Sequence, residues 1–552
     1  MQQFSAAHRA VHYPEDRRHY VWIHPAALAA LAVVLLLPVV IAWIQYLIAG
    51  LPPEQVRYPM QPVPEPHGFP AWLRLTHFFN FFFLMLLARS GLSILADHPR
   101  LYFNHHCTPG TEWIRFTPIS VPTDRLWTAK DDARYVSPLL ALPGYRHTIG
   151  MARSWHFFSL CGFLLNGILF IILLFATDQW LRLVPTSWEI VRQAWTTFVH
   201  YATLHLPVEP NGFYYYNPLQ QLGYFAVIFV MVPLSTLTGI AMSPALDNRF
   251  TWYPHLFGGR QSARSIHFIL LVAYIGFFIV HVSLVVITGF VRNMNHIVMG
   301  TDDLNPMGLV IGLAAIAAVV ASWALLHYIA WKYPRRVQLL HKAMAVPFLA
   351  VLDRFHPQEH YAKEDISPFF WPNGKLPDSD EWKRLARDGF KEYRLHIGGL
   401  VDHPTSLSLD DLRRLEREEH VSLHHCIQGW SGIAEWAGVP MSAIIQLVKP
   451  RPEAKVVAFY SFGEGLYGGA YYDTQTIENV LKPQCILAYD MNGHALSDIY
   501  GAPLRLRVEN QLGYKMVKWV KSIEFVETET KIGEGEGGKN EDDEYFDLLP
   551  NI

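Results

Sequence analysis

The stretch RSIHFILLVAYIGFFIVHVSLVVITGF, residues 264–290, is an apolar run that carries two histidines. A bilayer core is about 30 Å thick and a helix needs about 20 apolar residues to cross it, so the run predicts a membrane-spanning helix. His267 and His281 are fourteen residues apart, which places them within roughly 40° around the helix and about 21 Å apart along it. Because ionisable side chains inside a membrane usually mark function, each histidine is expected to have a partner on a facing helix.

Five further apolar runs predict spans at about residues 26–49, 71–96, 151–177, 219–242 and 307–331. Charged residues make up 17% of the 552 residues, and the deficit falls in the first 330, which predicts an all-α transmembrane bundle followed by a soluble domain. The expected units are an N-terminal segment with the first span (1–65), the membrane domain with the last span (66–335), a linker (336–365), a soluble domain (366–530) and an acidic, flexible tail (531–552).

Six spans place both termini on one side of the membrane. Most lysines and arginines outside the spans fall on that side, so the positive-inside rule predicts that the termini and the soluble domain are cytoplasmic. The net charge of -3 argues against a nucleic-acid partner. The four cysteines are too scattered for CxxC metal sites, CxxCH haem attachment or a cysteine-ligated cluster. Any redox centre must therefore be held in another way.

Histidines in two other spans match the depths of those in the quoted run. His77 begins the second span at the outer face, level with His281, and His156 begins the third at the cytoplasmic face, level with His267. A bis-histidine haem needs one imidazole from each of two facing helices, so the pairs predict two haem irons. The alternative is that these histidines form hydrogen bonds between helices.

The four core helices, three of which carry the paired histidines, resemble the bacterial cytochrome b561 and nickel-iron-hydrogenase b-type cytochrome family over about residues 66–300. The matching segments are RLTHFFNFFFLMLLARSG, SWHFFSLCGFLLNG, PLSTLTGIAMSP and IHFILLVAYIGFFIVHV. The resemblance implies two b haems in the bacterial inner membrane that pass electrons to or from quinone.

Short β runs begin beyond residue 366, at 393–401, 455–462, 485–491, 504–510 and 517–526, and Asn492-Gly493 predicts a hairpin turn. One helix is expected in SLDDLRRLERE, with Ser408 and Asp411 as a capping box. An α+β domain is therefore predicted. Its chemistry concentrates on LHHCIQGWSG, residues 423–432, where Cys426 is either a buried structural cysteine or a nucleophile beside His425.

The order of WPNGKLP, HHCIQGWSG, GAPLRLRV and GYKMVKWVKSIEF is similar to the molybdopterin-binding domain of the sulfite oxidase family. The resemblance covers about residues 366–528 and implies that Cys426 binds molybdenum as a thiolate, a soft ligand that suits this metal. It also implies that the following residues bind the molybdopterin cofactor: His424, His425, Arg505, Arg507, Tyr514, Lys515 and Lys518. Two alternatives are equally open: the two arginines could lie at solvated strand edges, and Tyr514 could belong to the core.

Together the two halves predict a membrane-bound molybdenum oxidoreductase that exchanges electrons between a cytoplasmic molybdopterin site and quinone through two b haems. Its substrate would be a small S- or N-oxyanion or oxide. The sequence does not determine the direction of electron flow, and a homodimer is possible. The loop 97–150, with Trp113 and Trp127, is the expected docking surface for the soluble domain. The alternative is an electron-transfer anchor whose soluble domain docks a separate redox partner.

Overall fold

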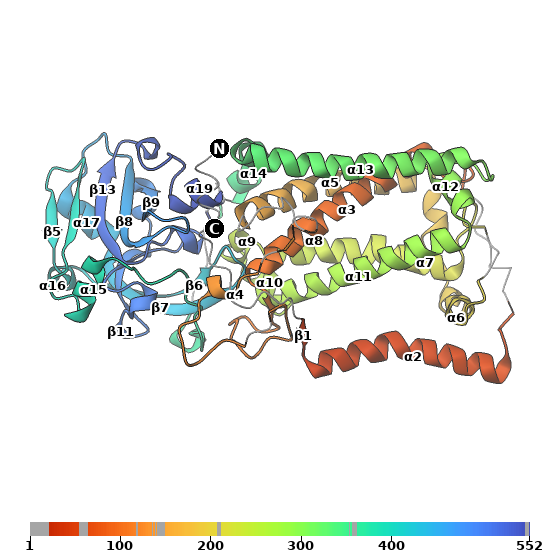
Figure 1. Ribbon diagram of the computed structural model, residues 1–552, viewed down its shortest axis with the longest axis horizontal. Helices are drawn as coiled ribbons and strands as arrows, with labels where there is room; N and C mark the ends of the chain where they lie inside the picture. The colour runs from red at the N-terminus through yellow and green to blue at the C-terminus, as the bar shows by residue number, and fades with distance from the viewer. Residues whose placement is uncertain are drawn as a thin grey trace.

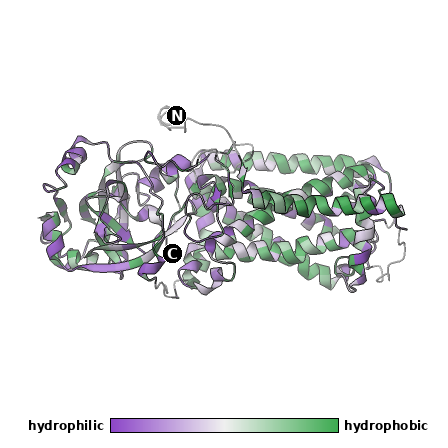
Figure 2. Ribbon diagram, turned by 90° about the horizontal axis from the view of Figure 1, so that it is seen from below, coloured by the Kyte–Doolittle hydropathy of each residue, from purple (hydrophilic) through white to green (hydrophobic). Residues whose placement is uncertain are grey.

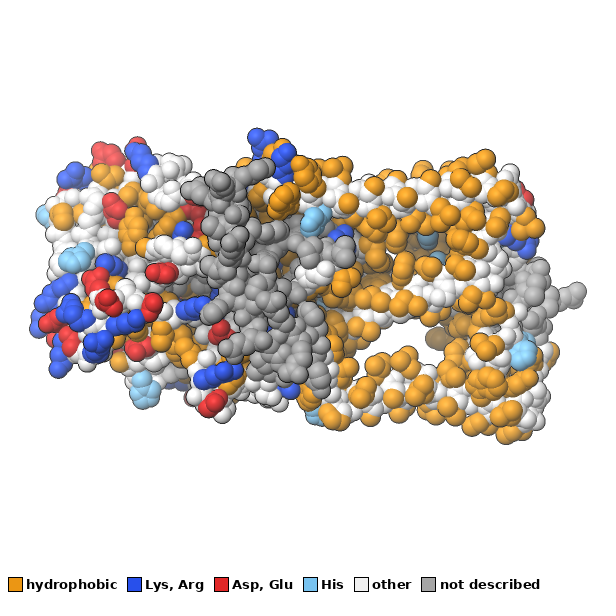
Figure 3. Space-filling model, viewed as in Figure 1, with side chains coloured by type: hydrophobic (Ala, Val, Ile, Leu, Met, Phe, Trp, Pro, Cys, Tyr) orange, Lys and Arg blue, Asp and Glu red, His pale blue; other side chains and the backbone are white. Residues whose placement is uncertain are grey.

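The computed structural model describes residues 21–53, 64–117, 120–134, 136–137, 140, 149–206, 211–352, 354–355, 361–546 and 551–552. A long helical bundle lies at one end of the molecule and a β-rich domain at the other (Figure 1). Hydrophobic residues dominate the bundle and alternate with hydrophilic ones in the β-rich domain (Figure 2). Figure 3 shows hydrophobic side chains over the outside of the helices, as expected for contact with lipid.

Six helices in the described part of the chain are long and apolar enough to cross a membrane, which confirms the predicted spans. Their bounds lie within four residues of those expected from the sequence, and the fourth span is divided among three consecutive helical segments. The spans are α2 (Pro25–Ala49), α3 (Ala71–Asp97), α5 (Ile149–Ala176), α7 with η2 and α8 (Pro218–Phe225, Ala226–Met231, Val232–Ala241), α11 (Arg260–Ile287) and α13 (Pro306–Lys332).

Local sequence explains where several of these helices begin. Proline is at the first position of α2, α7 and α13, where its missing amide hydrogen leaves no bond unmade. Asn217 and Gln220 form a reciprocal capping box at α7. Gly259 has φ 96, a conformation that glycine adopts without strain, and turns the chain into α11. The first turn of α11 is polar and buried, so the helix begins at Arg260, four residues before the start expected from the apolar run.

Shorter helices complete the membrane domain. α6 (Glu189–Ala202) and α12 (Phe290–Val298) lie at the end of the bundle far from the β-rich domain (Figure 1). Part of the expected linker is helical instead: α14 (Pro334–Leu352) follows α13 directly, with proline again at its start. α2 stands beside the bundle and is tied to α6 by a 2.9 Å hydrogen bond from Trp195 Nε1 to Gln45 Oε1.

The β-rich domain has two five-stranded sheets. One has the order β11-β10-β7-β6, with β12 also paired to β10, and the other has the order β5-β4-β13-β8-β9, in which only β4 and β13 run parallel. The strands are β4 (Leu395–Gly399), β5 (Thr405–Leu407), β6 (Glu418–His425), β7 (Ser431–Pro440), β8 (Val456–Glu464), β9 (Ala470–Thr476), β10 (Cys485–Met491), β11 (His494–Ala495), β12 (Arg505–Val508) and β13 (Val520–Val526).

The predicted strands, hairpin and capping box are present. β10 and β11 are joined by Asn492-Gly493, both with positive φ, as a two-residue primed turn requires. Ser408 and Asp411 cap α16 (Leu409–Arg414) reciprocally. β5, β6, β7 and β9 were not predicted. β7 is buried along its whole length and so lacks the alternation that marks a half-buried strand.

The loop after α3 docks the β-rich domain against the bundle, as expected. Trp371 donates Nε1–H to the carbonyl of Cys107 at 2.7 Å, and the amide of Ala129, in the short helix α4 (Ala129–Asp132), donates to the carbonyl of Pro372 at 2.8 Å. Trp113 instead bonds to Ser265 Oγ on α11 at 2.9 Å. The loop therefore contacts the β-rich domain through its backbone and is fixed to α11 by the Trp113 side chain.

The acidic tail differs from the prediction. Residues 531–546 pack against the domain, and α19 (Lys539–Glu544) buries three carboxylate residues, Glu541, Asp542 and Glu544. Asp542 accepts hydrogen bonds from the backbone amides of Glu534 and Glu536. Local contacts of this kind order a segment whose composition alone predicts mobility.

Candidate functional site

The four predicted haem-ligand histidines form two pairs inside the bundle. The ring centres of His77 on α3 and His281 on α11 are 6.3 Å apart, and those of His156 on α5 and His267 on α11 are 6.4 Å apart. A metal–imidazole bond is about 2.0–2.1 Å long, as for zinc, so two imidazoles on opposite sides of one metal have ring centres about 6 Å apart. Both pairs have the separation that one iron requires.

Hydroxyl groups lie within hydrogen-bond distance of Nδ1 of three of the four rings. Ser90 Oγ lies 3.0 Å from Nδ1 of His156, Thr238 Oγ1 lies 3.1 Å from Nδ1 of His267, and the Tyr224 hydroxyl lies 3.4 Å from Nδ1 of His281. A second hydrogen bond of this kind sets the tautomer of a metal-binding histidine. With Nδ1 occupied in His156, His267 and His281, Nε2 is the nitrogen left for iron in these three, and the residues present fit haem.

The second candidate site begins at Cys426, in the turn between β6 and β7. The Cys426 amide donates to the Trp430 carbonyl at 3.1 Å, and the Gly429 amide donates to the Cys426 carbonyl at 3.0 Å. Gly429 has φ 105, a conformation that L side chains rarely adopt. Burial raises the pKa of the Cys426 thiol to about 12, so a metal must displace the proton when it binds.

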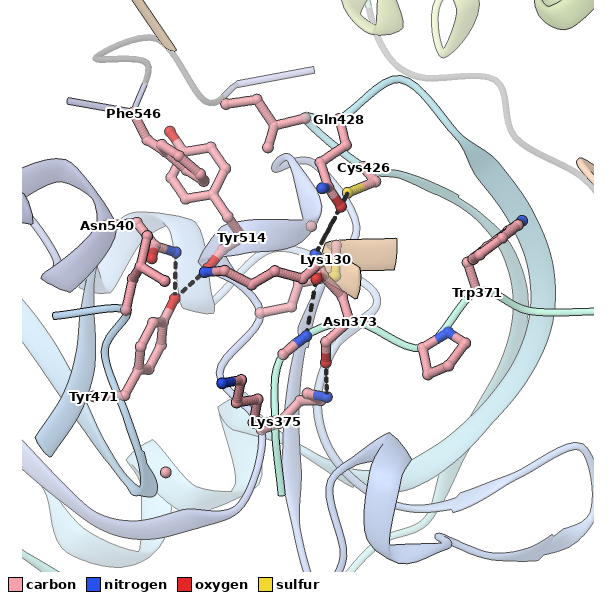
Figure 4. A pocket seen from close by; sticks show the side chains of 18 of the residues that line it. Lys130, Trp371, Asn373, Lys375, Cys426, Gln428, Tyr471, Tyr514, Asn540 and Phe546 are labelled. Atoms are coloured by element: carbon pink, nitrogen blue, oxygen red, sulfur yellow. Dashed lines mark hydrogen bonds between the residues drawn. The ribbon is translucent and has the colours of Figure 1, made fainter. Parts of the chain in front are cut away.

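Cys426 lines a cavity of about 180 Å³ that is open to the outside. Figure 4 shows its sulfur facing the space shared by Asn373, Gln428 and Lys130. Of the residues implied by the family resemblance, five line the cavity: His424, Cys426, Arg505, Tyr514 and Lys518. The cavity thus brings together the sulfur and most of the predicted cofactor-binding side chains.

Two of these side chains, Lys518 and Arg505, are buried basic groups that form no ion pair with a carboxylate of the described residues. Lys518 donates to backbone carbonyls of Asn373 and Ile499, and Arg505 donates to the Tyr500 carbonyl. Neither forms an ion pair with a residue that the structure describes, and burial lowers the pKa of both. Burying an unpaired charge is costly, so an anion such as the cofactor's phosphate fits beside them.

Arg507 acts on the cavity through His424 and does not line it. Its guanidinium donates to Nδ1 of His424 at 3.1 Å and pairs with Glu509 through two bonds of 2.8 Å. Burial, followed by the nearby arginines, lowers the pKa of His424 well below its usual range. The imidazole is therefore neutral, and because Arg507 can only donate, the hydrogen of His424 lies on Nε2.

The structure does not bring Lys515 or His425 to the cavity. Lys515 pairs with Asp473 and with Glu541 of the C-terminal segment, at 2.6 Å from the latter. His425 follows His424 on β6 and therefore faces the other way; its Nε2 lies 3.0 Å from Asn248 Oδ1 in the membrane domain. In the structure both side chains are buried, and these contacts lie away from the cavity.

Sequence reasoning missed several residues that line the cavity. Asn373, in the quoted WPNGKLP, donates Nδ2 to Gln428 Oε1 at 3.2 Å and lies 3.9 Å from Cys426 Sγ. Lys130 comes from α4 in the membrane domain, and Asn540, Glu544 and Phe546 come from the C-terminal segment. Asn373 could have been found, because it lies in the WPNGKLP segment that supports the family resemblance. No sequence pattern connects the other four residues with Cys426.

The Cys426 turn is also bonded directly to α11, the helix that carries two of the predicted haem-ligand histidines. Arg260 and Gln261, in the first turn of α11, each donate to the Gly429 carbonyl at 3.0 Å, and Gln261 also donates to Ser431 Oγ at 3.1 Å. All these groups are buried. Because α11 carries His267 one and a half to two turns further on, the two candidate sites share one rigid connection.

Comparison with known proteins gives a match for each half of the chain. Residues 68–300 match the family model of the prokaryotic cytochrome b561, and residues 383–532 match that of the oxidoreductase molybdopterin binding domain.

Three curated relatives are similar to parts of the chain. A putative protein-methionine-sulfoxide reductase subunit YedZ1 from Azospira oryzae is 34% identical over 131 residues, 24% of this chain and 48% of that protein. The catalytic subunits MsrP of protein-methionine-sulfoxide reductases from Xanthomonas axonopodis and Campylobacter jejuni are 32% and 27% identical, over 24% and 29% of this chain and 45% and 58% of those proteins. The matches span about half the length of these relatives.

Proposed function

We propose that the chain is a membrane enzyme that reduces a sulfoxide with electrons taken from quinol. Its two halves match the family models of the prokaryotic cytochrome b561 and of the oxidoreductase molybdopterin binding domain. The relatives named as methionine-sulfoxide reductase subunits support a sulfoxide as the substrate and reduction as the direction. The two histidine pairs support two haems between quinol and the molybdopterin site.

The observation that carries this proposal is the bonding of the Cys426 turn to the first turn of α11. A molybdenum centre supplies oxygen-atom transfer coupled to two electrons, and each b haem supplies one electron at a time. The chain's own residues would hold these groups in a row: Cys426 the metal, His156 with His267 the nearer haem, and His77 with His281 the farther one. No mobile carrier is needed between them.

We also propose that the β-rich domain lies in the cytoplasm. Four of the basic residues on its side of the bundle, Arg100, Arg134, Arg249 and Arg260, are buried and so do not face the membrane surface. The same side still has Arg125, Lys332, Arg336 and Lys342 at or near the surface, against Arg192 and Arg292 in the far loops. The remaining bias supports the positive-inside orientation.

The test of the proposed function follows the haem absorbance of the purified protein. After reduction with a quinol analogue, methionine sulfoxide should reoxidise the haems in the wild type and in Cys161→Ser, a control for loss of a thiol away from the cavity. In Cys426→Ser the haems should stay reduced, with the haem spectrum intact and molybdenum content lowered.

Other outcomes of this experiment are equally informative. Reoxidation by an N-oxide alone would replace the substrate class, and haem reduction by an oxyanion such as sulfite would reverse the direction. Folded protein that holds haem but no molybdenum would overturn the enzyme assignment and favour the electron-transfer anchor.

A further inference from the structure

Three segments from outside the two β-sheets close the cavity around Cys426. Asp97 comes from the end of α3, Lys130 from α4, and Glu544 from the C-terminal segment, together with Asn540 and Phe546. These segments are far apart in the sequence, and Figure 4 shows Lys130 extending among Cys426, Tyr514 and Tyr471. The cavity is therefore complete only when the membrane domain and the C-terminal segment are both in place.

Specific contacts hold the C-terminal segment against this cavity. On α14, Arg335 donates to the Glu541 carbonyl at 2.6 Å and pairs with Glu536 at 3.2 Å, and Gln338 donates to the Tyr545 carbonyl. The Phe546 ring packs edge-on against Tyr514 with centres 5.1 Å apart. Residues on either side of Glu544 are thus fixed to both domains.

Glu544 is a buried carboxyl group aimed into the cavity. Its exposed fraction is 6%, it lines the cavity, and Lys130, which lines the same cavity, is the positive charge that acts on it. The titratable groups that face it are Lys130, Asp97, Tyr471 and its neighbour Asp543. A buried carboxyl group that lines a cavity opposite a lysine can hold its proton or release it there, because burial favours the neutral form and the lysine favours the ionised form.

We propose that Glu544 donates protons to the oxygen of the substrate, so that the C-terminal segment is part of the active site. The inference rests on the proposed function, because reducing a sulfoxide consumes protons. The sulfur–oxygen bond breaks, the sulfur gains two electrons that arrive through the haems, and the oxygen takes two protons and leaves as water. Glu544 supplies each proton in turn and is reprotonated from solvent.

The electrostatics around Glu544 agree with this role. Burial raises the pKa of Glu544, which keeps the carboxyl group protonated at a higher pH than in water, while Lys130 opposes the shift. The same lysine favours the carboxylate that remains once the proton has left. A proton donor with a pKa moved toward the working pH is the usual requirement for general acid catalysis.

The first test compares Glu544→Gln with the matched control Asp543→Asn, whose carboxylate pairs with Lys539 and does not line the cavity. The kcat of Glu544→Gln should fall about 100-fold or more, since general acid catalysis contributes about 10²–10⁴-fold. Glu544→Asp should recover part of the loss. In the wild type, kcat should fall as the pH rises through the pKa of Glu544, and this limb should vanish in Glu544→Gln.

The second test needs no substrate and so separates this inference from the proposed function. Redox-induced infrared difference spectra of the holoenzyme should contain a carboxylic-acid carbonyl band in the wild type and in Asp543→Asn but not in Glu544→Gln. A band that persists in Glu544→Gln, or unchanged kcat and pH dependence in a wild type that does reduce sulfoxides, would overturn the role of Glu544. A wild type that shows the band but reduces no sulfoxide would contradict only the proposed function.

Discussion

Two of the predicted haem-ligand histidines, His156 and His267, are bonded to small hydroxyl side chains on neighbouring helices. Ser90 bonds to Nδ1 of His156 and also donates to the carbonyl of Leu86 at 2.8 Å, so its position is set by its own helix. Thr238 has the same arrangement with His267 and Leu234. Removing such a partner leaves the ligand in place but frees its orientation, which commonly costs about 10–100-fold in metal affinity.

Ser90→Ala should therefore weaken haem binding at the His156–His267 site about 10-fold. The measurement is the haem-to-protein ratio after purification and dilution, together with a redox titration that resolves the two haems. Ser93→Ala, on the same helix with its hydroxyl bonded to the Arg89 carbonyl at 3.1 Å, is the control. Equal haem retention in the two variants would show that the hydroxyl of Ser90 does not support the ligand.

Single residues also show what the sequence could and could not predict. The four histidines were identifiable because polar residues stand out in apolar runs and the helical repeat fixes their faces. Lys518 and Lys515 are only three residues apart, yet Lys518 reaches the cavity while Lys515 pairs with Glu541. That pairing depends on a segment 26 residues further on, and no local pattern announces it.

At the scale of elements, the first turn of α11 has two roles that a hydropathy pattern does not separate. It continues the membrane helix, and its buried polar side chains bond to the Cys426 turn. The sequence predicts the apolar part of this helix well. It does not predict the polar turn, because Arg260 and Gln261 resemble residues of an ordinary loop until the partner carbonyl of Gly429 is known.

Gln261→Ala should slow electron transfer between the haem and the molybdopterin site and leave both sites loaded. The variant loses two bonds that position the Cys426 turn, and small misplacements at reacting groups cost up to about 100-fold in rate. Quinol-driven turnover should fall about 10-fold or more, whereas turnover with a reduced viologen, which reaches the cavity directly, should not.

The neighbouring Ser262→Ala is the matched control, because Ser262 bonds to the Phe103 carbonyl and does not touch the Cys426 turn. Equal losses with quinol and viologen in Gln261→Ala would instead indicate damage to the molybdopterin site itself.

At the scale of the whole molecule, the docking loop, the first turn of α11 and the C-terminal segment fix the β-rich domain to one end of the bundle. The side of the membrane that holds this domain therefore decides which compartment supplies the substrate. Since the domain sits at the end where His156 and His267 lie, the proposed function predicts that quinol reacts near the opposite surface, beside His77 and His281. The orientation of the chain in the membrane therefore determines which substrates the β-rich domain can reach.

Single cysteines at exposed positions test this orientation. Glu453 lies in the β-rich domain, Ser187 lies in a loop at the far end of the bundle, and both side chains are exposed. The two variants are Glu453→Cys and Ser187→Cys. A maleimide that cannot cross membranes should label Ser187→Cys in intact spheroplasts and Glu453→Cys only after lysis, because the exposed basic residues favour the cytoplasm for the β-rich domain. The wild type measures background labelling of the native cysteines, three of which are buried. Labelling of Glu453→Cys in intact spheroplasts, with Ser187→Cys protected, would place the domain outside, and sulfoxides outside the cytoplasm would then be the accessible substrates.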